Sequence, residues 1–427
     1  MLRSTLRLAN RLNAGSLFFF AAVAIATPAF AHHGGGTFEL NKTVSFTGAK
    51  LTKLEFLNPH GWLYFETTER DGKVQKHRCE MRSAHVLRRS GWSPELFKSG
   101  EKVDITASPD RADVASCYLQ TIVFANGTRM DRYGQYVKAP DGGVKEVRGA
   151  VKVVNTANRP ARRPSGEPNI SGDWAPEQVV MADPRGVGGG LQRLSTIPQD
   201  PAAAAAAAAA ARAARAGGAG APGGAPPRGG GAPGAGRGRG AGGPRMFNGA
   251  EVTELGEKAA AAFKPEDNPR FKCETTSIIF DWTFDGPVNR ITQNKDTIVI
   301  QYGQLNLKRT VYMNMTTHPP NVKLTRAGHS TGRWDGDTLV VDTVGFLPGV
   351  INGAIHHGEK MHVVERFTLD PKTWQLGRTW ELEDSDYLKG KAIGANPEVI
   401  MPADAEYTED KCKEQKDLDY SKVTAKK

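Results

Sequence analysis

Three ionisable side chains in the C-terminal third have the types that hydrolases and lyases use to move protons: His329, Asp337 and His362. We take them as the candidate catalytic residues. Two of them lie in an expected β-hairpin over residues 328–346, because an Asp-Gly pair separates two β-prone runs. Asp337 and Asp342 also resemble an acid pair. Their odd spacing along one strand predicts opposite faces, which does not support glycoside hydrolysis.

A second group of polar residues follows the hairpin. It contains His356, His357, His362 and Glu365, with His329 across the expected sheet. His362 and Glu365 are three positions apart, so they cannot both point into one barrel lumen from an unbroken strand. This spacing weakens a metal site built on that pair. His357 and His329 remain open as ligands, and solvated loop or surface residues are the alternative.

The expected mature N-terminus has metal-binding chemistry. Cleavage after Ala31 would free the α-amine of His32, and this amine and the His32 imidazole can chelate one metal. A third imidazole would complete a copper histidine brace, or bind another divalent metal. His60 is the preferred third ligand, with His85 and His33 in reserve. The alternative is that these histidines have no metal role and that His60 belongs to a turn.

The first 31 residues have the pattern of an export signal. An apolar run over residues 17–25 precedes the small-x-small site Ala29-Phe30-Ala31. The basic region before it contains Arg3, Arg7 and Arg11. Cleavage would leave 396 of 427 residues, with no later apolar run of about 20 residues to span a bilayer. The sequence therefore predicts an exported protein, periplasmic or secreted, without a transmembrane segment after cleavage.

The chain has four cysteines, Cys79, Cys117, Cys273 and Cys412. An oxidising compartment favours their pairing, and four cysteines allow three connectivities. We favour Cys79 with Cys117 and Cys273 with Cys412, because each pair then closes one folding unit. No Cys-x-x-Cys pattern is present to indicate a zinc cluster or a thioredoxin-type site.

Residues 32–137 predict a small barrel with the order of an oligonucleotide/oligosaccharide-binding (OB) fold, three strands, a helix and two strands. The β-prone runs cover residues 43–57, 62–68, 74–81, 102–108 and 116–124. A short helix is expected over residues 83–90, since Ser83 can cap its start and Gly91 ends it. In that topology the third and fifth strands are neighbours, which independently places Cys79 beside Cys117.

Several motifs in this part resemble an uncharacterised exported bacterial family, DUF6152. They are His32-His33, Asn58-Pro59-His60-Gly61-Trp62, Arg89-Ser90-Gly91-Trp92 and Gly100-Glu101-Lys102-Val103. The resemblance covers about the first quarter of the chain. It implies a small exported β domain and brings no established activity.

The net charge of +10 owes much to a low-complexity insert over residues 182–262. Its acid-free tract of alanine, glycine and proline contains Arg212, Arg215, Arg228, Arg237, Arg239 and Arg245. Such composition is typical of a solvated linker and predicts little stable structure. It lacks the aromatic residues of a nucleic-acid site, so we expect no specific nucleic-acid binding. Residues 138–168 are expected to be a second linker.

In the C-terminal part, the sequence predicts an antiparallel, lipocalin-like barrel or sheet over residues 263–416. A charged tail follows at 417–427. Candidate strands cover residues 277–284, 288–293, 297–302, 307–313, 329–334, 338–345, 361–369 and 375–383. Its first strand is expected earlier, within 169–181, where Gly172-x-Trp174 resembles the opening strand of lipocalin-like barrels. Residues 328–343 and 362–367 resemble a β-rich domain of hypothetical exported bacterial proteins, again without an activity.

The sequence thus predicts an all-β protein of two domains. It contains no Gly-x-Ser-x-Gly elbow, Walker loop or His-Glu-x-x-His motif. The leading hypothesis is a non-enzymatic binding or structural protein of the cell envelope, acting on an envelope ligand or protein. The alternatives are a copper protein using His32 and His60, and a hydrolase or lyase centred on His329 and His362.

Overall fold

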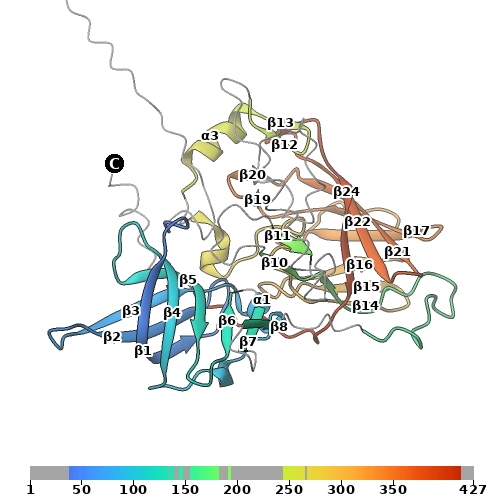
Figure 1. Ribbon diagram of the computed structural model, residues 1–427. Helices are drawn as coiled ribbons and strands as arrows, with labels where there is room; N and C mark the ends of the chain where they lie inside the picture. The colour runs from blue at the N-terminus through green and yellow to red at the C-terminus, as the bar shows by residue number, and fades with distance from the viewer. Residues whose placement is uncertain are drawn as a thin grey trace, which may run out of the picture.

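Two β-barrels make up the described part of the chain (Figure 1). The computed structural model describes residues 38–132, 134–138, 144–147, 154–181, 191–193, 244–264 and 267–414. A barrel of five strands, blue to green in Figure 1, is followed by a barrel of nine strands, green to red. The predicted all-β fold class is confirmed.

The N-terminal barrel has the predicted strand order. Its strands are β1 (Val44–Glu55), β2 (Trp62–Thr68), β3 (Val74–Glu80), β4 (Lys102–Pro109) and β5 (Ser116–Val123). They pair in the order β3-β2-β1-β4-β5, and a parallel β3–β5 pairing closes the barrel. Helix α1 (Ala84–Arg89) and the 3-10 turn η1 (Pro94–Leu96) lie between β3 and β4 in the chain.

Both predicted disulfides are present. The β3–β5 pairing sets Cys79 directly opposite Cys117, and the two are bonded in the barrel core. Cys273, at the end of the 3-10 turn η4 (Pro269–Lys272), is bonded to Cys412. The sheet also continues from β5 into β6 (Arg129–Asp131), β7 (Gly134–Lys138) and β8 (Val144–Val147), so it extends into residues assigned above to the linker.

The C-terminal barrel closes in the order β14-β15-β16-β17-β18-β21-β22-β24-β9. Its strands are β9 (Gly172–Pro176), β14 (Asn289–Gln293), β15 (Thr297–Gln301), β16 (Lys308–Tyr312), β17 (His329–Asp335), β18 (Thr338–Val344), β21 (His362–Asp370), β22 (Gln375–Glu383) and β24 (Lys391–Pro402). Strand β9 pairs with both β14 and β24 and so closes the ring. The expected first strand around Gly172 and Trp174 is therefore part of this domain.

One pairing in this barrel is parallel. Strands β16 and β17 run in the same direction, with Val311 opposite Ser330, whereas the other neighbours in the ring are antiparallel. The purely antiparallel order expected from the sequence is wrong at this point. A parallel pair needs a crossover connection in place of a tight turn. Residues 313–328 make this connection and contribute His318 and much of the groove described below.

The expected strand over residues 277–284 is also wrong. These residues form turns, and Ile278, Ile279 and Trp282 are buried in the barrel core. Two carbonyls of the segment, those of Ile278 and Ile279, accept hydrogen bonds from the Arg378 guanidinium, both at 2.9 Å. A short apolar run bounded by turn residues is compatible with a buried strand and with a buried segment of turns. The periodicity of the sequence does not distinguish the two.

Strand β24 was not predicted, although it has 12 residues. Gly394 and the Asn396-Pro397 pair indicate a break in the chain. In the structure they fall at an irregularity, because Arg378 is opposite Glu398 while Trp380 is opposite Gly394. The register shift accommodates the proline, which cannot donate to the ladder.

Smaller elements surround the barrel. They are β10 (Val179–Met181), β11 (Leu191–Arg193), β12 (Met246–Phe247), β13 (Ala250–Val252), α3 (Glu254–Ala262), β19 (Gly349–Asn352), β20 (Ile355–His357) and β23 (Leu388–Lys389). The Thr253 hydroxyl caps α3 by accepting from the Gly256 N–H. The last part of the expected insert is thus ordered against β23. No described helix is long and apolar enough to cross a membrane.

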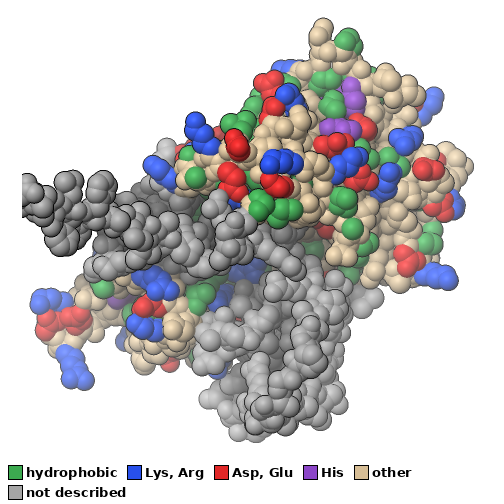
Figure 2. Space-filling view, turned by 90° about the horizontal axis from the view of Figure 1, so that it is seen from above, with side chains coloured by type: hydrophobic (Ala, Val, Ile, Leu, Met, Phe, Trp, Pro, Cys, Tyr) green, Lys and Arg blue, Asp and Glu red, His purple; other side chains and the backbone are tan. Residues whose placement is uncertain are grey.

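The barrel lumen contains a buried charged cluster. Glu365 on β21 lies between Arg309 on β16 and Arg378 on β22, and all three side chains are fully buried. Three strand positions away, His362 is partly exposed. The two residues occupy opposite faces, as strand alternation predicts. On the face shown in Figure 2, acidic and basic side chains are interspersed.

Candidate functional site

Three neighbouring strands bring His329, Asp342 and His362 to one outer patch of the barrel. Asp342 is opposite Thr331 on β17 and opposite Val364 on β21. His329 and His362 are each two positions from those partners, so they lie diagonally across from Asp342 on the same face. His318 joins them from the crossover between β16 and β17. From the sequence, His329 is grouped with His362, Asp342 is considered only as a partner of Asp337, and His318 is missed.

The four side chains form a continuous chain of hydrogen bonds. His329 Nδ1 lies 2.8 Å from His318 Nδ1, and His318 Nε2 lies 2.9 Å from Asp342 Oδ1. His362 Nε2 lies 3.1 Å from both oxygens of the same carboxylate. We call this set, His329–His318–Asp342–His362, the histidine chain. Asp342 joins its two halves, because it accepts from a histidine on each side.

The pKa values of the two histidines at the ends of the histidine chain are shifted in opposite directions. The hydrogen bond to Asp342 raises the pKa of His362, and that of His362 in turn lowers the pKa of Asp342. At the other end, burial and the neighbouring His318 lower the pKa of His329. When His318 is neutral and donates Nε2–H to the carboxylate, its Nδ1 accepts from His329. His329 then presents a free lone pair on Nε2.

An open groove of about 470 Å³ begins at His329. It lies between the outer face of β16 and residues 322–329. Its lining includes Lys308, Tyr312, Val322, Lys323, Arg326 and His329. The Tyr312 ring stacks on the His329 ring, with centroids 5.1 Å apart and planes inclined by 19°. The histidine chain therefore ends at the groove.

The groove is basic. Its lining contains four basic residues, Lys308, Arg309, Lys323 and Arg326, and no aspartate or glutamate. Arg309 is paired with the buried Glu365. Arg326 is partly neutralised by Glu274, at 2.6 Å. Both lysines are exposed. A concave site with one sign of charge attracts ligands of the opposite sign.

Asp337, the third catalytic candidate, is not part of this group. It follows the turn at the far end of the β17–β18 hairpin, where it pairs with Arg162 at 2.7 Å. His357 is buried beside Gly358, and burial lowers its pKa to about 4. Its neighbour His356 hydrogen-bonds to the Ala354 carbonyl. Neither of them joins the histidine chain.

The metal candidates His60 and His85 lie where the two barrels meet. His60 Nδ1 is 2.8 Å from Glu80, and its ring packs against Phe271. Burial opposes protonation of His60, but the charge and hydrogen bond of Glu80 prevail and raise its pKa. His85 Nε2 lies 3.6 Å from Asp410.

His32 and His33 lie outside the described residues, so the copper brace stays a prediction. Within the described ranges, no group of three or more histidine, cysteine, aspartate or glutamate residues could hold a metal ion. In the histidine chain, His318 directs its two ring nitrogens at different partners, His329 and Asp342.

Comparison with known proteins identifies part of the N-terminal half. Residues 21–117 match DUF6152, a family of unknown function. No curated protein and no solved structure matches the chain. The DUF6152 region includes Asn58, His60, His85 and Arg89, and it ends at Cys117, within β5. The expected resemblance is thus confirmed for this region, and the histidine chain lies outside it.

Replacing Asp342 with asparagine is expected to lower the pKa of His362. The substitution removes the charge and the hydrogen bond that raise this pKa, while burial continues to depress it.

In the parent protein, the Asp342–His362 pair stabilises the fold most between about pH 4 and 6.5. Asp342 loses its charge below this window, and His362 loses its proton above it. NMR titration of the imidazole signals measures the change in the His362 pKa, and urea unfolding across this pH range measures the stability of the parent.

The matched control for this change is Asp337→Asn, at the opposite end of the same hairpin. It removes a carboxylate that pairs with Arg162 and is not part of the histidine chain. The pKa of His362 should stay where it is in this variant. An unchanged His362 titration in Asp342→Asn would show that the carboxylate does not control this histidine.

Proposed function

We propose that this chain is an exported, non-enzymatic binding protein of the cell envelope, and that its ligand is a small anion bound in the basic groove. Export is supported by the signal pattern of the first 31 residues and by two disulfides, which persist in oxidising compartments. The observation that carries the proposal is the groove itself, whose lining has four basic residues and no acid.

The dimensions and chemistry of the groove suit a small molecule. Its volume of about 470 Å³ is within the usual range for small-molecule sites, roughly 300–1,000 Å³. Lys308 and Lys323 can each donate a charge-assisted hydrogen bond to a carboxylate or phosphate oxygen. Tyr312 and Val322 add apolar surface beside these charges. An organic anion with a flat apolar part therefore fits better than a neutral sugar.

His329 makes the proposed binding dependent on pH. Its pKa is lowered because it is partly buried and lies beside His318. A bound anion would favour the protonated imidazolium and so raise this pKa. Affinity for the anion is therefore expected to increase as the pH falls through the titration of His329. The same linkage requires that ligand binding takes up protons.

A test uses benzoate and inorganic phosphate as probes on the full chain purified from the periplasm. Binding is followed by calorimetry and by the imidazole signal of His329. Each lost charge-assisted hydrogen bond should weaken binding by about tenfold, so Lys308→Gln with Lys323→Gln should weaken it by about a hundredfold. Lys295→Gln, an exposed lysine in the β14–β15 turn, is the control. Equal affinity in the double variant and the parent would refute the site.

A second candidate function follows from the histidine chain. His329 is hydrogen-bonded to His318, and the Asp342 carboxylate orients His318. A neutral imidazole that is held in this way can act as a general base. His329 at the groove would then serve a hydrolase or lyase, with Asp342 in the role that was expected for Asp337. Incubating the protein with aromatic carboxylate esters distinguishes the two functions. Turnover that is lost in His329→Ala would support the enzyme, and binding without turnover would support the binding protein.

A further inference from the structure

Three basic residues of the DUF6152 region each bind an aspartate of the C-terminal domain. Arg82 Nη2 lies 2.9 Å from Asp285, and Arg89 Nε lies 3.0 Å from Asp404. The third pair is His85 with Asp410, at 3.6 Å. In each of these pairs both side chains are at least four-fifths buried. Three buried pairs between the same two domains indicate a specific interface, because a buried charge is tolerated only when it is paired.

The spacing of the three basic residues explains why they act together. His85 and Arg89 are four positions apart in the helix, which places them on one side of α1, and Arg82 lies just before the N-cap residue Ser83. Arg89 also donates to the carbonyls of Gly286 and Pro176, at 2.9 and 2.8 Å. The helix therefore presents a row of donors to the second barrel.

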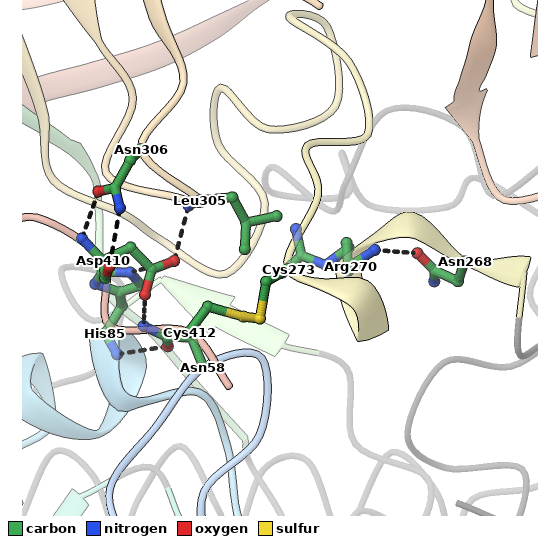
Figure 3. The surroundings of a disulfide bond; sticks show 9 residues. All are labelled: Asn58, His85, Asn268, Arg270, Cys273, Leu305, Asn306, Asp410 and Cys412. Carbon is green, nitrogen blue, oxygen red and sulfur yellow. Dashed lines mark hydrogen bonds and ion pairs between the residues drawn. A yellow bond between two sulfur atoms is a disulfide. The ribbon is translucent and has the colours of Figure 1, made fainter. Parts of the chain in front are cut away.

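The Asn58 loop completes the surface beside α1. The Asn58 side-chain amide donates to Asp410, and its oxygen accepts from the His85 N–H at 3.5 Å. Figure 3 shows Asp410 between this loop and the C-terminal barrel, where the Leu305 N–H donates to it at 2.7 Å. Burial raises the pKa of Asp410, but its interactions with His85, the Leu305 N–H and Asn58 outweigh burial and keep this pKa low. This aspartate therefore joins both domains in its ionised form.

Two of the three aspartates belong to one segment, residues 403–414, which we call the strap. The strap follows β24 and is held to the C-terminal domain by the Cys273–Cys412 disulfide, visible beside Asp410 in Figure 3. It also reaches the first barrel through its backbone, since the Lys413 N–H donates to the Asn58 carbonyl at 3.3 Å. The disulfide thus holds the acidic residues in place for the DUF6152 region.

We propose that the face formed by Asn58, Arg82, His85 and Arg89 is a protein-docking site for an aspartate-bearing surface, and that the C-terminal barrel with its strap is the occupant. The DUF6152 region then acts as a recognition module that orients the second barrel. The chemistry that it recognises is three carboxylates held by a rigid β domain. This role is independent of the basic groove, which lies on the other barrel.

The test cuts the connection between the modules in the folded full chain. A protease site is inserted between Gly149 and Ala150, so that each disulfide stays within one product. After cleavage, size-exclusion chromatography shows whether the two products remain together. We expect them to co-elute at low micromolar concentration, and to separate more readily as salt increases. Separation of the unsubstituted products at low salt would overturn the proposal.

Substitutions in the cleaved chain test the charge recognition. Arg89→Asp should weaken the association by at least about thirtyfold, because truncating one partner of a buried charge pair leaves the other charge buried and unpaired. Adding Asp404→Arg should recover at least tenfold, which a folding defect would not do. Arg88→Asp, on the exposed side of the same helix, should leave co-elution unchanged. Unchanged association in Arg89→Asp, or no recovery in the swap, would contradict the assignment.

Discussion

Replacing Glu365 with glutamine is expected to reduce the free energy of unfolding by about 3–5 kcal/mol, because the substitution leaves buried positive charge without its partner. Glu365 accepts from Arg309 on one side and from Arg378, at 3.1 Å, on the other. Arg378 keeps Glu398 as a second carboxylate partner. Arg309 has no other carboxylate partner among the described residues, and its Nε and Nη2 are already without hydrogen-bond partners there.

Urea unfolding of the two proteins measures this difference. The matched control is Glu383→Gln on the neighbouring strand β22, where the carboxylate is about half exposed and pairs with Lys391. Exposed pairs of this kind contribute about 0–1 kcal/mol, so the control should unfold close to the parent. If Glu365→Gln unfolded at the same urea concentration as Glu383→Gln, the lumen cluster would not stabilise the barrel.

Removing the Cys273–Cys412 disulfide, by alanine at both positions, should cost about 4–5 kcal/mol and should loosen the strap selectively. The bond joins residues 139 positions apart, and in the chain-entropy account a longer closed loop gives a larger stabilisation. The strap has no regular strand or helix of its own, so its fixed position depends on side-chain pairs and on this bond. Amide hydrogen exchange over residues 403–414 should therefore accelerate.

The second disulfide supplies the comparison. Cys79–Cys117 spans 38 positions, and the same account gives about 4 kcal/mol for its loss. Alanine at both of these positions should destabilise the N-terminal barrel and leave exchange in the strap nearly unchanged. Equal acceleration of strap exchange in both variants would mean that the strap reports global unfolding. It would then not report release from the DUF6152 region.

Local sequence patterns were sufficient for the N-terminal barrel. Alternating runs, turn residues and one short amphipathic helix gave the order of its elements, and that order placed Cys79 next to Cys117. The same logic placed most C-terminal strands, because each run is bounded by residues with a clear turn preference. It failed at residues 277–284 and at β24. The apolar run at 277–284 could form either a strand or a buried set of turns, and the proline in β24 could either end a strand or lie at an irregularity within one.

The candidate site was only partly visible in the sequence. His329, Asp342 and His362 could be related through strand pairing and alternation. His318 could not, because it lies in a crossover whose path depends on the parallel β16–β17 pairing. A histidine before two prolines in a long connection was the available signal. The groove needs the same crossover, so its basic lining was equally hidden.

The sequence by itself determined the all-β class, the two-module division and the opposite faces of His362 and Glu365, and it favoured the observed cysteine pairing. These depend on short-range periodicity and on a strand order that few topologies satisfy. Only the tertiary structure decided which polar residues meet. Asp342 binds His318 because a parallel crossover returns there, and His85 and Arg89 bind aspartates more than 300 positions away. Such pairings depend on how complete barrels pack, which local residue patterns do not specify.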